Sequence, residues 1–166
     1  MKKNIFINTT IVLIMVVLAS ACKKDVPAGG TSMEKMAGDW YVQVNNQGTY
    51  YSVLSFNTSA DDGKEMWIQT SGTIKSGSTV IAVKGKIPVN LNDQSFSGTN
   101  IANIASTKTT IPTFSVANGK VVTNGTVAPI SKAVADLISF DLIVNGVSYK
   151  VEGFHKTGFL EDFPPF

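Results

Sequence analysis

The feature that most restricts the fold is an Asn-Gly pair at positions 145 and 146, flanked by residues that alternate between apolar and polar. Asn-Gly is typical of a two-residue type I′ turn between antiparallel strands. A turn of this kind places apolar residues opposite each other, in the pairs Val144 and Val147, Leu142 and Tyr149, and Phe140 and Val151. The other face carries Asp141, Ser148, Lys150 and Glu152. Because turn geometry and hydrophobic pattern agree, residues 137–155 predict a half-buried β-hairpin.

The same period-two pattern begins at Trp40 and recurs in short runs bounded by Gly and Asn. A turn at Ser76-Gly77 pairs Ile74 with Thr79 at its tip, and further down it pairs the residues Met66 with Ile87 and Trp67 with Lys86. A turn at Asn118-Gly119 places Val116 opposite Val121. The predicted strands are 40–45, 49–57, 65–74, 79–87, 91–97, 110–117, 120–127, 137–144 and 147–155. This pattern favours an all-β fold, either an antiparallel up-and-down barrel of about 8–9 strands or a sandwich.

Two stretches do not fit a strand pattern. Residues 97–109 are mainly polar and are interrupted by glycine and asparagine, which predicts a loop over one end of a barrel. Residues 130–138 have Ser131 as a candidate N-cap and apolar residues at helical spacing, so a short helix is expected there.

The first 21 residues have the pattern of a signal peptide, with an N-terminal "MKK", a short apolar core and small residues before Cys22, the only cysteine. The sequence "LASAC" resembles a bacterial lipobox, which implies cleavage before Cys22 and attachment of lipid to it. An ordinary signal peptide with a chance cysteine is the alternative. Residues 22–36 lack periodicity and predict a flexible tether, which leaves residues 37–166 as one domain.

The residues after Cys22 bear on where the protein is displayed. A lysine and an acidic residue in "KKD" resemble the surface-export signal of Bacteroidota lipoproteins. We therefore expect an outer-membrane lipoprotein on the cell surface, with the periplasmic side as the alternative. The net charge of +2 and the complete absence of arginine give no reason to expect a nucleic-acid partner.

The start of the predicted domain reads "GDW", Gly38-Asp39-Trp40. It resembles the glycine-any-tryptophan motif of lipocalins, in which the indole plugs the closed end of the barrel and a basic side chain packs over it. Here only lysines are basic, so Lys150 or Lys156 would take that place. From "MAGDWYV" to "YKVEGFHKTGFLED" the chain resembles the Bacteroidota lipoprotein family labelled lipid-binding putative hydrolase, which implies a small lipocalin-like barrel.

A barrel of about eight strands can hold one small ligand or be filled by its own side chains. The inward-facing residues predicted to line such a ligand site, or to form an ordinary core, are Trp40, Val42, Met66, Ile68, Phe140, Leu142, Tyr149 and Val151. The expected ligand is a small apolar or amphipathic, lipid-like molecule. The alternative is a surface domain that binds glycan or another envelope protein through the outward-facing aromatics Tyr41, Tyr50 and Trp67.

Catalysis is the third hypothesis. His155 is the only histidine, and the chain contains no G-x-S-x-G sequence that would mark a nucleophilic serine. A histidine near a strand end is more often structural than catalytic. Asp61, Asp62 and Glu65 lie on a glycine-containing turn without the full ligand spacing of a calcium loop. One histidine and one cysteine are too few ligands for a structural zinc site. Haem ligation by His155 has no support in the sequence. We therefore expect no catalytic residues, no metal and no cofactor.

Overall fold

The computed structural model describes residues 30–105 and 110–164. The predicted signal peptide, Cys22 and most of the predicted tether lie outside the described residues. Residues Thr31–Phe166 form one compact unit. This unit begins six residues before the predicted domain boundary because Met33 and Met36 are fully buried in the core. No helix in the described part of the chain is long and apolar enough to cross a membrane.

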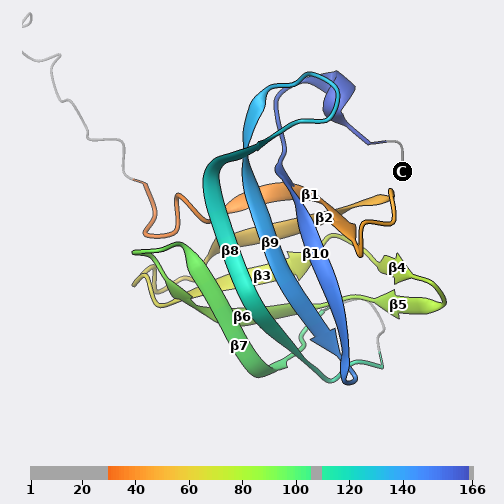
Figure 1. The fold of residues 1–166 in the computed structure, drawn as a ribbon. Coiled ribbons are helices and arrows are strands. Elements are labelled where there is room, and N and C mark those ends of the chain that lie inside the picture. Colours follow the sequence, from red (N-terminus) through yellow and green to blue (C-terminus); the bar gives the residue numbers. More distant parts are fainter. Residues whose placement is uncertain (1–29, 106–109, 165–166) are drawn as a thin grey trace, which may run out of the picture. The chain divides into compact units, whose positions relative to one another are not determined.

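Eight antiparallel strands close into a barrel, in the spatial order β1-β10-β9-β8-β7-β6-β3-β2 (Figure 1). The barrel strands are β1 (Gly38–Val44), β2 (Tyr50–Asn57), β3 (Glu65–Thr70), β6 (Lys84–Asn90), β7 (Ser95–Ala102), β8 (Thr113–Val127), β9 (Val134–Val144) and β10 (Val147–His155). A separate hairpin consists of β4 (Ile74–Ser76) and β5 (Thr79–Ile81), and a short 3-10 helix, η1, spans Leu160–Asp162. The predicted all-β, up-and-down barrel is confirmed.

The C-terminal hairpin has the predicted register. Leu142 lies opposite Tyr149 and Phe140 lies opposite Val151. Asn145 and Gly146 both have positive φ, of 51° and 79°, as a type I′ turn requires. Apolar residues of β9 and β10 therefore point inward and charged residues point outward.

The predicted hairpin between residues 65 and 87 is correct in its barrel part and wrong at its tip. Met66 pairs with Ile87 and Trp67 pairs with Lys86, as expected. Ile74, however, pairs with Ile81 and not with Thr79. The segment between β3 and β4 contains Gly72 with a φ of 89°, and it interrupts the long strand, so that β4 and β5 form a hairpin of their own.

Three other predicted elements differ. Asn118-Gly119 is not a hairpin turn, because β8 runs through it as one strand of 15 residues with a register shift against β9. A side chain on Gly119 would collide with Phe96, so close packing explains this glycine. Of the predicted loop 97–109, residues 97–102 instead continue β7, residues 103–105 lie outside any strand, and residues 106–109 lie outside the described residues. The helix predicted over 130–138 is also wrong, since β9 begins at Val134 and its inward residues pack in the barrel.

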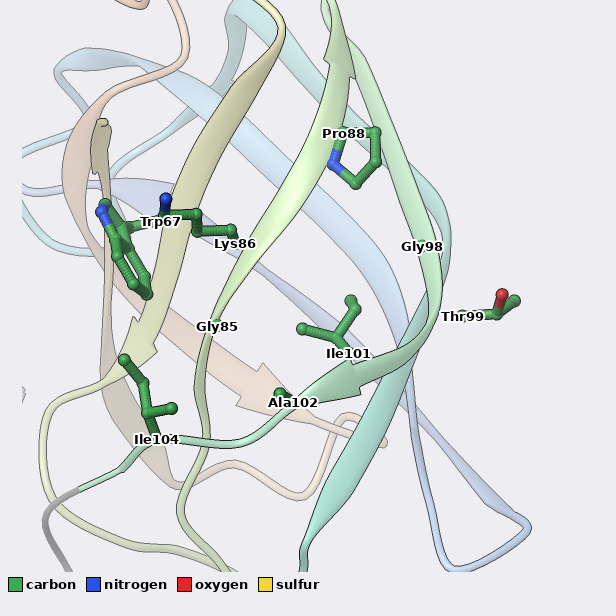
Figure 2. A pocket seen from close by; sticks show the side chains of 9 residues that line it. All are labelled: Trp67, Gly85, Lys86, Pro88, Gly98, Thr99, Ile101, Ala102 and Ile104. Carbon is green, nitrogen blue, oxygen red and sulfur yellow. The ribbon is translucent and has the colours of Figure 1, made fainter. Parts of the chain in front are cut away.

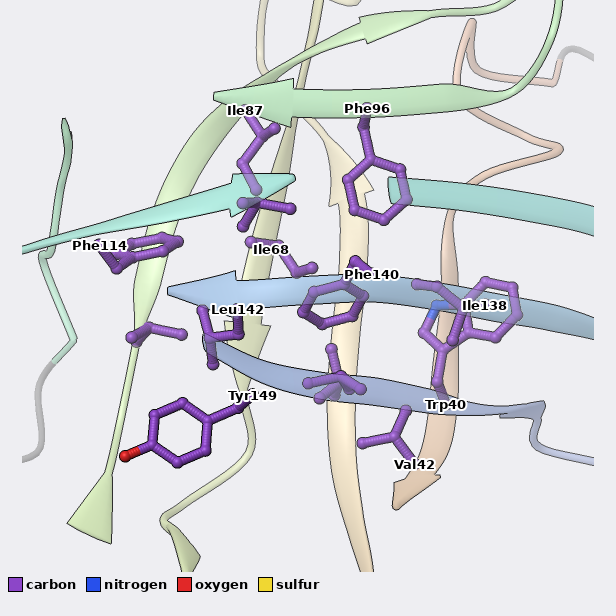
Figure 3. Packing of buried hydrophobic residues seen from close by; sticks show 14 of the residues in the cluster. Trp40, Val42, Ile68, Ile87, Phe96, Phe114, Ile138, Phe140, Leu142 and Tyr149 are labelled. Carbon is purple, nitrogen blue, oxygen red and sulfur yellow. The ribbon is translucent and has the colours of Figure 1, made fainter. Parts of the chain in front are cut away.

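One hydrophobic core fills the barrel (Figure 3). All eight residues predicted to face inward belong to it: Trp40, Val42, Met66, Ile68, Phe140, Leu142, Tyr149 and Val151. A smaller cluster lies outside the barrel wall, where Tyr41 and Phe154 are buried together with Ala128. The barrel therefore has a packed inside and one covered patch on its outside.

Candidate ligand-binding site

The barrel interior is lined by the residues that the sequence predicted. Their exposed fractions lie between 0 and 7%. A cavity large enough for a ligand would leave part of its lining exposed, so in the described structure these side chains form a core. Figure 3 shows Phe140, Leu142 and Ile138 pointing toward the residues of the facing strands. A role of the eight residues in ligand binding stays a prediction, and it requires this core to open.

The "GDW" motif closes one end of the barrel. Trp40 is 1% exposed, and its indole Nε1 donates a hydrogen bond to Ser55 Oγ at 2.7 Å. The Ser55 hydroxyl donates in turn to the carbonyl oxygen of Met36 at 2.6 Å. The imidazole of His155 packs edge-on against Trp40, with ring centroids 5.0 Å apart. Gly38 is required here because any side chain at this position would collide with His155.

The expected lysine over Trp40 is therefore wrong, since His155 occupies that place. Lys150 is exposed and lies 3.4 Å from Glu152. Lys156 forms an ion pair with Asp39 at 2.6 Å, and its ammonium lies 4.5 Å from the ring centroid of Tyr41. Burial, followed by the Asp39 carboxylate, raises the pKa of the Tyr41 phenol. Lys156 thus has structural contacts at the closed end, whereas Lys150 lies near the turn at the opposite end of β10.

A hollow with a volume of about 580 Å³ lies in the barrel wall between β6 and β7 (Figure 2). We call it the β6–β7 hollow. It is lined by Trp67 of β3, by Gly85, Lys86 and Pro88 of β6, and by Gly98, Thr99, Ile101, Ala102 and Ile104 of β7 and the residues after it. A volume of 300–1,000 Å³ is typical of small-molecule sites.

The hollow exists because β6 and β7 pair over a short length. Their register holds only the pairs Val89 with Phe96 and Asn90 with Ser95. Beyond that point β7 shifts register twice against β8, between Phe96 and Gly98 and between Gly98 and Ile101. Such bulges bend a strand away from its neighbour, and Pro88 has no N–H with which to bond across the gap.

The other end of the hollow is closed by Asn103. Its amide group donates to the carbonyl oxygens of Ala82 and Ile111, each at 2.9 Å, and its side-chain oxygen accepts from the N–H of Lys84 at 2.9 Å. The N–H of Ile104 also bonds to the carbonyl oxygen of Lys84 at 2.9 Å. Hydrogen bonds at both ends therefore fix the separation of the strands.

The floor of the hollow is apolar. Ile101 is 9% exposed and points from β7 toward β6 (Figure 2). A Cβ at Gly85 would lie 2.5 Å from Ile101 Cγ2 and 2.9 Å from the Phe114 ring. Glycine at this position therefore allows Ile101 and Phe114 to pack against the backbone of β6. Ile101 and Phe114 thus separate the hollow from the barrel core.

The rim next to Trp67 is positively charged. The ammonium groups of Lys84 and Lys86 lie 5.5 Å and 5.3 Å from the Trp67 ring centroid, within the range of cation–π attraction. Trp67 also stacks on Phe56, with ring centroids 6.3 Å apart. The hollow therefore combines an apolar floor with lysine side chains beside a half-buried indole.

Sequence reasoning missed this hollow, because residues 97–109 were assigned to a loop. The predicted pairing of Trp67 with Lys86 on the outer face was correct and gave one of its walls. Of the other two aromatics expected to be exposed, Tyr41 is 3% exposed beneath Phe163, and Tyr50 is half-buried against Phe154. Of the three aromatics that the glycan or protein alternative relies on, Tyr41 is therefore buried, while Tyr50 and Trp67 are half-buried.

The candidate catalytic and metal residues have other contacts. In the described part of the chain, no serine or threonine hydroxyl is hydrogen-bonded to His155. Asp61 accepts hydrogen bonds from the N–H and hydroxyl of Ser32, at 2.8 and 2.7 Å, and Asp62 pairs with Lys64 at 3.5 Å. Glu65 pairs with Pro88 at the start of β3. Among the described residues no three His, Cys, Asp or Glu side chains are grouped closely enough to hold a metal ion.

A closed antiparallel barrel of eight strands, with a tryptophan plug at one end, defines a lipocalin-like protein. The chain belongs to the family described as lipid-binding putative hydrolase, whose sequence pattern matches residues 25–160. The comparison with curated proteins found no match. A lipid-binding family and a barrel of this kind fit a protein that binds a ligand.

Proposed function

We propose that this protein binds one small apolar or amphipathic, lipid-like molecule in the β6–β7 hollow, while a lipid on Cys22 anchors it to the bacterial outer membrane. The observation that carries the binding proposal is the hollow itself, about 580 Å³ in volume, with an apolar floor in an otherwise packed barrel. The family to which the chain belongs is described as lipid-binding, which supports the same chemistry.

The lining favours a ligand with an apolar chain and a negatively charged head. Ile101, Ala102 and Ile104 offer apolar surface to a chain. Lys86 stands at the rim and is exposed, so it can meet a carboxylate without losing its hydration completely. A head group held there would lie beside Trp67, whose ring already attracts two lysines.

Uptake of fatty acids tests the proposal. We expect residues 31–166 to bind a long-chain fatty acid at 1:1 stoichiometry in native mass spectrometry and to show a saturable change in tryptophan fluorescence, because Trp67 lines the hollow. Ala102→Trp fills the hollow from its exposed edge and should weaken binding by about tenfold or more, since it removes the apolar contact surface.

Val122→Trp is the matched control, because Val122 is an exposed residue of β8 outside the hollow. It should bind like the parent chain. Lys86→Glu should weaken binding of the fatty acid more than binding of the alcohol of equal chain length. If Ala102→Trp binds as tightly as the parent, the ligand does not occupy the hollow.

A further inference from the structure

A second surface lies at the closed end of the barrel. β8 and β9 extend past the barrel, and the residues that connect them lie beside η1 (Figure 1). Val127 pairs with Val134 at the base of this connection. The C-terminal segment 156–163 therefore packs against the connection 128–133, and together they form a projection.

Asp162 holds the projection together. Its carboxylate is 2% exposed, and it accepts hydrogen bonds from the N–H of Ser131 at 2.9 Å and from the hydroxyls of Ser131 and Thr157. Lys132 Nζ donates to the carbonyl oxygen of Pro129 at 2.6 Å, and Ala128 is fully buried beneath the connection. Hydrogen bonds within the projection thus hold its two segments together.

The outside of the projection is apolar. Six of the eleven exposed large hydrophobic side chains of the described residues lie on the projection or at its base, and we call them the apolar tip: Val127, Ile130, Val134, Phe159, Leu160 and Phe163. Ile130 is 63% exposed and Leu160 is 80% exposed. Exposed apolar groups gathered in this way mark contact sites for a membrane or another protein, whereas scattered ones do not.

The place at which the compact unit begins indicates what the apolar tip contacts. Thr31, at which the compact unit begins, precedes β1, and the first residues of β1 pair with the last residues of β10, at the end from which the projection extends. The nine residues from Cys22 to Thr31 can span at most roughly 30 Å, at about 3.5 Å per residue. A lipid on Cys22 would therefore keep this end of the barrel close to the bilayer.

We propose that the apolar tip inserts into the surface of the lipid bilayer and fixes the orientation of the barrel on it. This inference rests on the proposed lipid anchor at Cys22. The tip carries Lys132 and Glu161, which have opposite charges, so apolar burial and not attraction to anionic lipids provides the contact. The β6–β7 hollow lies beyond the pair of Val89 with Phe96, farther from this end, and stays open to water.

The test places a tryptophan on the tip. The full chain is reconstituted in phosphatidylcholine vesicles with brominated acyl chains, which quench tryptophan only at close range. Leu160→Trp should lose about half or more of the emission that it adds to Trp40 and Trp67, because an interfacial side chain lies about 5–10 Å deep. Adding Ile130→Asp to this variant should abolish the quenching.

Two matched controls distinguish insertion from mere proximity. Leu91→Trp lies at the same end but outside the tip, and Val80→Trp lies on the β4–β5 hairpin at the other end. Neither should be quenched. Equal emission from Leu160→Trp in vesicles with and without bromine would overturn the proposal. A dimer in solution that Ile130→Asp dissociates would also overturn it, because the tip would then be a protein interface. Fatty-acid uptake by the tip variants should equal that of the parent chain, so failure of the hollow and failure of the tip are distinguishable.

Discussion

At the scale of single residues, the closed end of the barrel depends on the size of two side chains. His155 occupies the space that Gly38 leaves open, and its ring packs edge-on against Trp40. The sequence indicated the tryptophan plug but not its partner, because a lysine was expected where histidine stands. His155 is thus a packing residue in the structure, two positions from the polar network of Asp162 and Thr157.

Replacing each tryptophan by alanine should separate the plug from the rim of the hollow. Trp40→Ala should lower the free energy of unfolding by about 3–5 kcal/mol, as other large-to-small core changes do. Trp67→Ala should cost about 1 kcal/mol, because a half-exposed ring loses mainly its stacking on Phe56. Urea denaturation of both variants measures the difference, and equal losses would contradict the assigned faces of β1 and β3.

At the scale of elements, the C-terminal segment is attached to the β8–β9 connection through a carboxylate. Burial raises the pKa of Asp162, but the hydrogen bonds from Ser131 and Thr157 outweigh it and lower the pKa to about 2. A carboxyl with a lowered pKa stabilises the folded state above its ordinary pKa and loses this contribution as the pH falls through the folded value.

The attachment of the C-terminal segment to the β8–β9 connection should therefore weaken only at low pH. We expect the amide resonance of Ser131 to be constant down to about pH 4 and to shift as the pH falls toward about 2. Asp162→Asn should remove this titration, because the amide does not ionise. A Ser131 resonance that does not change between pH 5 and pH 2 in the parent chain would show that Asp162 does not hold the segment.

The accuracy of the sequence predictions also depends on the element. The C-terminal hairpin was predicted residue by residue, because Asn145 and Gly146 fix a register that burial independently requires. Asn118 and Gly119 gave the same local signal, yet they lie within β8, where Gly119 makes room for Phe96. Packing between residues far apart in the sequence determines that this pair lies within a strand and not in a turn. A single sequence does not reveal such contacts.

The hollow was missed for the same reason. Its walls come from three strands, and its existence depends on bulges in β7 and on the bonds of Asn103. The sequence showed Trp67 beside Lys86 but gave no sign that the neighbouring strands separate. The eight inward residues, in contrast, were predicted correctly as buried, because period-two alternation reports burial directly.

At the scale of the whole molecule, a packed barrel presents two different surfaces. The β6–β7 hollow interrupts the wall, and the apolar tip projects from the closed end. The proposed anchor at Cys22 would hold the tip against the membrane while the hollow remains accessible to ligand. In this proposal, ligand binding and membrane contact use separate parts of one domain.

The anchor can be tested by itself. Cys22→Ser should yield protein that is not labelled when cells are fed a radioactive fatty acid and that leaves the membrane fraction, because Cys22 is the only cysteine that could carry the lipid. The parent chain should be labelled. Labelling of the serine variant to the same extent would contradict the assignment of Cys22 as the attachment site.

The most direct test of the central claim locates the bound ligand. Residues 31–166 with labelled methyl groups would be saturated with a fatty acid, and nuclear Overhauser effects would be recorded between its alkyl protons and the protein. We predict contacts to Ile101, Ala102 and Ile104, which line the β6–β7 hollow. Contacts to Val42, Leu142 and Val151 instead would place the ligand in an opened barrel core and contradict the account.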